Sequence, residues 1–191
     1  MGKQKYTSAQ LADMTTHMRN RVICQVECAT PEEWIKGYTW YPNTHDMLRE
    51  WADETGYSFE QCVGVFAVMS ANKGYRQNVV SAWNILSGQA PMFGTGSEHD
   101  KSYAILDGDM SMVRGPKVSC FDGNIRHPMS DEWVTIDTIM MGMVGMSPKE
   151  LDVKGVRDAL KLGIRQAAAI LGLLPNQAQA IAWVVTRGND R

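Results

Sequence analysis

Cysteine is scarce in this chain, and its spacing excludes two common kinds of metal centre. The four cysteines stand at positions 24, 28, 62 and 120, and none forms a Cys-x-x-Cys pair, the spacing typical of structural zinc sites. No cysteine follows position 120, so the C-terminal part of the chain cannot hold an iron–sulfur cluster. We expect no metal, no other cofactor, and small buried cysteines in a reducing compartment. Chelation by Cys24 and Cys28, one helical turn apart, is the alternative.

Long apolar runs are also missing. No stretch approaches the roughly 18–20 apolar residues that cross a membrane. The segment from Met1 to Leu11 is polar and lacks the apolar core of a secretory signal. We therefore expect no membrane partner and a cytoplasmic protein.

The chain has no excess of positive charge. Its 19 Lys and Arg residues stand against 21 Asp and Glu residues, which gives a net charge of −2. Proteins that bind nucleic acids usually present a basic face. Here any such face has to be assembled by folding, because the sequence holds no basic cluster.

Helical patterning dominates what is present. Hydrophobic residues make up 44 % of 191 residues, enough for a sizeable core. Apolar residues recur at three- and four-residue steps, and N-caps such as Thr30, followed by Pro31, mark helix starts. We predict an all-α fold with loops at 38–43 and 88–99 and one short strand-like segment at 133–136. The predicted helices cover about 8–28, a short helix that starts at Pro31, 44–55, 59–71, 76–86, 102–106, 116 to 121 or beyond, 138–145, 153–171 and 175–187.

Lys117 and Asp137 are the residues whose chemistry suggests a function. Lys117 follows Gly115-Pro116 at a predicted helix start, and Asp137 follows an apolar β-branched run twenty positions later. A lysine amine can attack a sugar carbon and form a Schiff base, and a carboxylate stabilises the cationic centre that develops as a bond breaks. A helix dipole and partial burial would favour the neutral amine. The structural alternatives are a solvated lysine and an N-cap aspartate.

A second segment, Ser70-Ala71-Asn72-Lys73, stands at a predicted helix end. Together, this segment and the Lys117–Asp137 pair resemble the helix-hairpin-helix DNA glycosylases, in particular their 8-oxoguanine and endonuclease III branches. The similarity spans about residues 59–145. Gly115 matches the second glycine of that family's Gly-x-Gly turn, whereas Val113 replaces the first. Ile139 replaces a histidine that many relatives carry.

The resemblance implies an enzyme that binds double-stranded DNA, extrudes a modified or damaged base and cleaves its N-glycosidic bond. Lys117 would be the nucleophile, Asp137 would activate it and stabilise the cation, and β-elimination would nick the strand. Asn72 would fill the gap beside the extruded base, for which the alternative is a turn-forming residue. The remaining DNA-binding residues would be Lys73, Arg76, Arg114 and Gly115.

Small size and the missing cluster resemble phage-encoded members, whose location would be the host cytoplasm. We expect one glycosylase-like domain over residues 1–191, with two lobes as the alternative, and residues 59–145 as the core that carries the motifs. Two other functions stay open. One is an enzyme of DNA base hypermodification in the same superfamily, and the other is a catalytically silent protein that binds DNA or a host protein. The sequence specifies neither the target base nor the oligomeric state.

Overall fold

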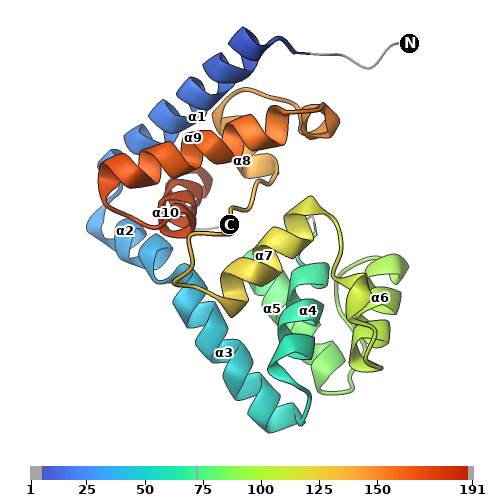
Figure 1. Cartoon of the computed structure of the whole chain (residues 1–191). Coiled ribbons are helices and arrows are strands. Elements are labelled where there is room, and N and C mark those ends of the chain that lie inside the picture. The colour runs from blue at the N-terminus through green and yellow to red at the C-terminus, as the bar shows by residue number, and fades with distance from the viewer. Residues whose placement is uncertain (1–5, 72, 189–191) are drawn as a thin grey trace. The chain divides into compact units, whose positions relative to one another are not determined.

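The computed structural model describes residues 6–71 and 73–188, and within these ranges its regular structure is entirely helical (Figure 1). The all-α prediction is therefore confirmed. The elements, in chain order, are α1 (Ser8–Cys28), α2 (Pro31–Tyr38), α3 (Trp40–Thr55), α4 (Phe59–Met69), α5 (Tyr75–Leu86), α6 (Gly96–Leu106), the 3-10 helix η1 (Met110–Met112), α7 (Pro116–Arg126), α8 (Thr138–Met143), the 3-10 helix η2 (Pro148–Asp152), α9 (Val156–Leu171) and α10 (Pro175–Arg187).

The chain divides into two compact units. Of the described residues, 6–41 and 129–188 form unit 1, and Pro42–Pro128 form unit 2. Lys117 thus belongs to unit 2, and Asp137 belongs to unit 1.

Unit 1 is built on close packing between α1 and α9, which lie side by side in Figure 1. The hydroxyl of Thr15 donates to the carbonyl of Ala159 at 3.0 Å and joins the two helices inside the core. Gly163 on α9 faces α1 so closely that a Cβ there would lie 2.5 Å from the Thr15 carbonyl oxygen. The core takes apolar side chains from α1, α8, α9, α10 and the segment before α8, namely Met18, Val22, Val26, Val134, Ile136, Met140, Met141, Leu160, Ile164 and Ile181.

We expect Gly163→Ala to lower the free energy of unfolding by about 1–3 kcal/mol, because the added methyl group meets backbone atoms that cannot rotate away. Gly142→Ala on α8 is the matched control. Gly142 is exposed, and a Cβ there meets nothing within 4 Å, so the change should be neutral or stabilise by up to about 1 kcal/mol. Urea unfolding of both variants measures the difference. Equal effects would show that helix propensity, rather than helix contact, decides both.

Unit 2 is organised around α4, which contacts α5, α6 and α7 (Figure 1). Eight consecutive residues of α4, Cys62 to Met69, are buried, as expected for a helix that is apolar on all sides. Phe66 lies at the centre of an aromatic cluster: Phe121 stacks on it at 6.1 Å between ring centroids, and Trp51 contacts it edge-on at 6.3 Å. Trp51 is therefore a packing residue.

Two predicted loops are wrong in part. The aromatic segment at 38–43 is helical from Trp40 on, because α3 begins there and Pro42 falls in its first turn, where no amide donor is needed. The loop at 88–99 ends at Thr95, which caps α6 and forms a capping box with Glu98. Tyr41, in the first turn of α3, is 3 % exposed and donates to the side chain of Gln179 at 2.8 Å, so it belongs to the core.

The segment at 133–136 forms no strand. Its residues Val134, Thr135 and Ile136 are buried and lead into the cap of α8. The segment finds no partner strand in the described ranges, and the side chains of Val134 and Ile136 belong to the helical core of unit 1.

Candidate functional site

The start of α7 holds the first candidate residue. Gly115 is the N-cap, with φ +95° and ψ 144°, a conformation that favours glycine. Pro116 occupies the first helical position, where its missing amide costs nothing. Lys117 follows in the first turn. The Gly-Pro sequence therefore fixes the direction in which α7 begins, and the position of Lys117 with it.

The side chain of Lys117 crosses to the end of α4. Its Nζ donates to the carbonyl oxygen of Ser70 at 3.2 Å and to the Ser70 hydroxyl oxygen at 3.1 Å. Nζ also lies 5.9 Å from the centre of the Phe121 ring, one turn along α7. The ammonium is partly buried, so Lys117 is not the solvated surface charge of the structural alternative. Within unit 2, the structure brings together the two segments that sequence analysis singled out.

Ser70 is a site residue whose role sequence analysis missed. Its hydroxyl donates to the carbonyl of Ala67 at 2.8 Å and is therefore oriented with its lone pairs available to Lys117. The two residues are 47 positions apart. No local pattern predicts such a contact.

Lys73 is engaged inside unit 2. Its ammonium forms an ion pair with Glu98 at 2.7 Å, and only 6 % of its side chain is exposed. It also donates to the carbonyls of Met69 and Ala71 at 2.8 and 3.2 Å. Three acceptors match the three donors of an ammonium, so Lys73 holds the turn after α4 together. Asn72, assigned above to the gap beside an extruded base, lies outside the described residues.

Arg76 and Arg114 are the exposed cations among the predicted DNA-binding residues. Arg76 lies in the first turn of α5, and Arg114 directly precedes the Gly115 cap of α7. Nine residues, 107–115, separate α6 from α7 and include η1. The connection is thus longer than a tight two-helix hairpin.

Asp137 holds the second candidate group, in unit 1. It is the N-cap of α8, as the structural alternative predicted, and its Oδ1 accepts from the amide of Met140 at 2.9 Å. Its Oδ2 accepts from the indole Nε1 of Trp183 at 2.9 Å. The half-buried carboxylate is therefore fixed through both oxygens, and the start of α8 adds favourable electrostatics.

Trp183 is the second residue that sequence analysis missed. It lies on α10, 46 positions from Asp137. The guanidinium of Arg187 sits 4.8 Å from its ring centre, one turn further along α10. Trp183 is a positioning residue for the Asp137 carboxylate. Its hydrogen bond restrains Oδ2, and together with the Met140 amide on Oδ1 it fixes the orientation of the carboxylate plane.

We expect Trp183→Phe to lower the free energy of unfolding by about 1 kcal/mol, because the exchange removes one donor to a charged group while keeping an aromatic ring. The same exchange in an Asp137→Ala background should cost less, since the acceptor is already gone. Urea unfolding of the four proteins gives the coupling energy. Equal losses in both backgrounds would show that Trp183 acts through packing alone.

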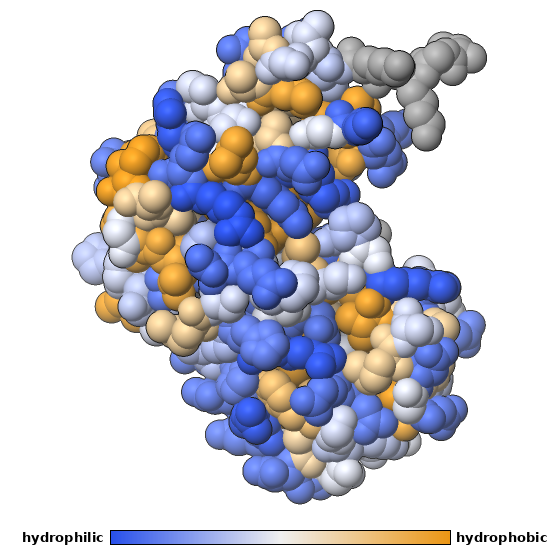
Figure 2. Space-filling model, in the orientation of Figure 1, coloured by the Kyte–Doolittle hydropathy of each residue, from blue (hydrophilic) through white to orange (hydrophobic). Residues whose placement is uncertain are grey.

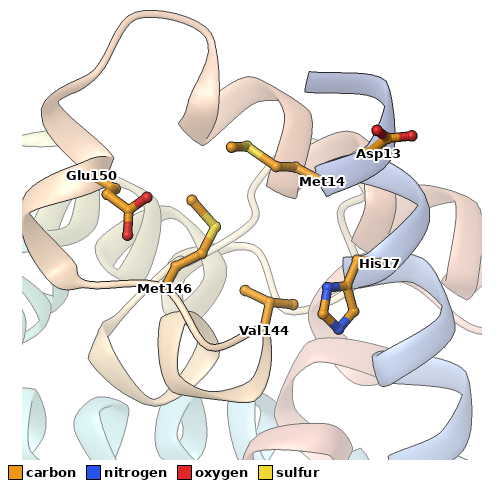
Figure 3. Close-up of a pocket in the computed structure, with 6 residues that line it drawn as sticks. All are labelled: Asp13, Met14, His17, Val144, Met146 and Glu150. Atoms are coloured by element: carbon orange, nitrogen blue, oxygen red, sulfur yellow. The ribbon is translucent and has the colours of Figure 1, made fainter. Parts of the chain in front are cut away.

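A small pocket opens on unit 1 beside α1 (Figure 3). Its volume is about 190 Å³, and its lining combines methionine and valine side chains with three titratable groups: Asp13, Met14, His17, Val144, Met146 and Glu150. Glu150 accepts from the Tyr6 hydroxyl at 2.5 Å and from the Ser147 amide at 2.6 Å. These hydrogen bonds hold the pKa of Glu150 below its ordinary value, with the Tyr6 contact the larger cause. The carboxylate is thus engaged in tying η2 to the N-terminal segment.

The cysteines differ from expectation in one respect. Cys62 and Cys120 are buried, as predicted, but Cys24 and Cys28 are exposed. Cys24 lies two residues after the buried Val22, and Cys28 lies two residues after the buried Val26. Two residues turn an α-helix by about 200°, so both cysteines face away from the core. No group of three or more His, Cys, Asp or Glu residues among those described has the arrangement to hold a metal ion. In the same ranges no single helix is long and apolar enough to cross a membrane.

Fold and candidate residues define an all-helical protein of two units, with a lysine anchored at a helix start in one and a doubly hydrogen-bonded carboxylate in the other. The chain belongs to the family described as "Family of unknown function (DUF7178)", whose model matches residues 4–190. No curated protein and no solved structure matches the chain.

Proposed function

We propose that this protein is a DNA glycosylase of the helix-hairpin-helix kind that extrudes and excises a modified base, with an associated lyase step. Lys117 attacks C1′ of the sugar, the bond from C1′ to the base breaks, and the base leaves with the bonding electrons. The sugar ring then opens: the C1′–O4′ bond breaks, O4′ takes up a proton and the adduct becomes a Schiff base, which permits β-elimination of the 3′ phosphate and nicks the strand. Asp137 activates the amine and stabilises the positive charge that develops on the sugar.

The observation that carries the proposal is the anchoring of Lys117 on Ser70. A nucleophile has to be held in one direction so that it meets the sugar carbon in a productive geometry. Ser70 does this from the segment that, by resemblance, lies beside the extruded base.

The geometry of Asp137 supports the same proposal. A carboxylate acts on a developing cation best when it does not need to reorient during the reaction. The Met140 amide and the Trp183 indole fix both oxygens, and a carboxylate oxygen has lone pairs for a further contact.

The alternative function is a catalytically silent protein that binds a host protein, and such a protein would be expected to expose a contiguous apolar patch. Figure 2 shows apolar residues among polar ones on the visible face. No α-helix of the described ranges carries more than two of the large exposed apolar side chains, which are Ile35, Tyr38, Tyr75, Met92, Phe93, Tyr103, Met129, Leu162 and Ile170. Such scattering is ordinary for a protein surface and does not favour that alternative.

The deciding experiment incubates the protein with duplexes that each carry one modified base, and assays free base, strand nicking and borohydride-trapped adduct. Excision from at least one duplex, with an adduct, is the expected result. DNA modification without base release would favour the hypermodification enzyme. Binding without any chemistry across the panel would favour the silent protein.

We expect Arg114→Ala to weaken duplex binding and to reduce the slope of log K against log [salt] by about 1, because one phosphate contact is lost. Arg76→Ala should act in the same way. Arg49→Ala is the matched control, since Arg49 is exposed in unit 2 but its guanidinium lies over Phe59, outside both segments. Fluorescence anisotropy between 50 and 200 mM salt measures the slopes. If the slopes of Arg114→Ala and Arg76→Ala equal the slope of the Arg49→Ala control, neither Arg114 nor Arg76 contacts a phosphate.

A further inference from the structure

The solvent-facing side of α1 carries two thiols one turn apart. Cys24 and Cys28 are both exposed, on a helix whose buried positions are Thr15, Met18, Val22 and Val26. Residues four apart on a helix have Cβ atoms about 5–6 Å apart, and metal–thiolate bonds are about 2.3 Å long. The two sulfur atoms can therefore reach one ion without any change in the helix.

The two thiols interact with each other. The hydrogen bond with Cys24 is the largest cause that raises the pKa of Cys28 above its ordinary value, and the repulsion between two thiolates follows it. An ion that binds the two sulfur atoms as thiolates has to displace their protons.

We propose that Cys24 and Cys28 form a two-thiolate site for a soft monovalent metal ion, Cu(I). Soft thiolates select soft ions such as Cu(I). Zinc, iron and the hard cations need further protein ligands, and no third His, Cys, Asp or Glu joins this pair in the described residues. On binding, two S–H bonds are replaced by two Cu–S bonds and two protons pass to water. Copper keeps its oxidation state, so no redox partner is required.

The test is an anaerobic titration with Cu(I) held by the chromophoric chelator bathocuproine disulfonate. We expect the protein to withdraw one Cu(I) per chain. Cys24→Ser and Cys28→Ser should each weaken the competition at least about a hundredfold, because a second linked ligand contributes 10²–10⁴-fold. The double variant should compete less than either single variant, because no thiol of the pair remains. Because each Cu(I) releases two protons, the apparent affinity should also rise with pH.

Cys62→Ala is the matched control. Cys62 is buried, and desolvation raises its pKa to about 11, so its loss should leave copper binding unchanged. Full competition by either serine variant would overturn the proposal, since the thiols would then act singly. Binding of one zinc ion between two chains, with dimer formation, would also overturn it in favour of a four-thiolate site.

Discussion

Asp137→Asn is expected to lower the single-turnover rate of base release about 10²–10⁴-fold, because asparagine carries no charge to stabilise the developing cation. Duplex binding should change little, since the lost interaction forms only as the glycosidic bond breaks. Rapid-quench assays on the most active duplex of the modified-base panel measure the rate, and anisotropy measures binding. Wild-type excision by this variant would remove Asp137 from the mechanism.

Local structure requires a control for that exchange. Asparagine can keep the cap bond to the Met140 amide, but its NH2 group would then face the Trp183 indole N–H, donor against donor. Asp137→Asn combined with Trp183→Phe removes this conflict. If the rate loss comes from the missing charge, the double variant should be as slow as Asp137→Asn. Recovery of activity in the double variant would show that the conflict, rather than the charge, caused the loss.

Local signals predicted much of the fold. The bounds of α1 and α10 agree with prediction because Thr7 caps α1, Pro175 opens α10 and apolar residues repeat at helical spacing within both. The start of α6 was missed because the glycine-rich composition of 88–99 outweighed the Thr95–Glu98 capping box. The composition of a segment averages over all its residues, whereas a capping box depends on only two residues three positions apart, here Thr95 and Glu98.

The site was predictable only in part, for a different reason. Lys117 and Asp137 were recognisable from their neighbours in sequence. Their hydrogen-bond partners Ser70 and Trp183 lie 47 and 46 positions away, and the packing of helices, which no local spacing encodes, brings each to its partner. The same holds for Lys73, whose ion pair with Glu98 spans 25 positions.

Lys117→Gln should abolish the borohydride-trapped adduct on a duplex that carries an abasic site, because only an amine forms the Schiff base. An abasic duplex tests the lyase step without knowledge of the target base. Lys117→Arg is the stricter variant, since it keeps the positive charge and donors for Ser70 but supplies no such amine. Both variants should still bind the duplex. Lys101→Gln on α6 serves as the control for adducts formed by any accessible lysine.

The exchanges at Lys117 and Asp137 should fail differently on a modified-base duplex. Lys117→Gln should retain slow base release, because water can replace the amine as nucleophile while Asp137 still stabilises the cation. Asp137→Asn should suppress release and trapping together on the same duplex. Wild-type trapping by Lys117→Arg would place the nucleophile on another residue and leave the anchoring on Ser70 without a catalytic purpose. Trapping that disappears in Lys101→Gln as well would mean that the loss is not specific to Lys117, and the assignment of the nucleophile would have to be withdrawn.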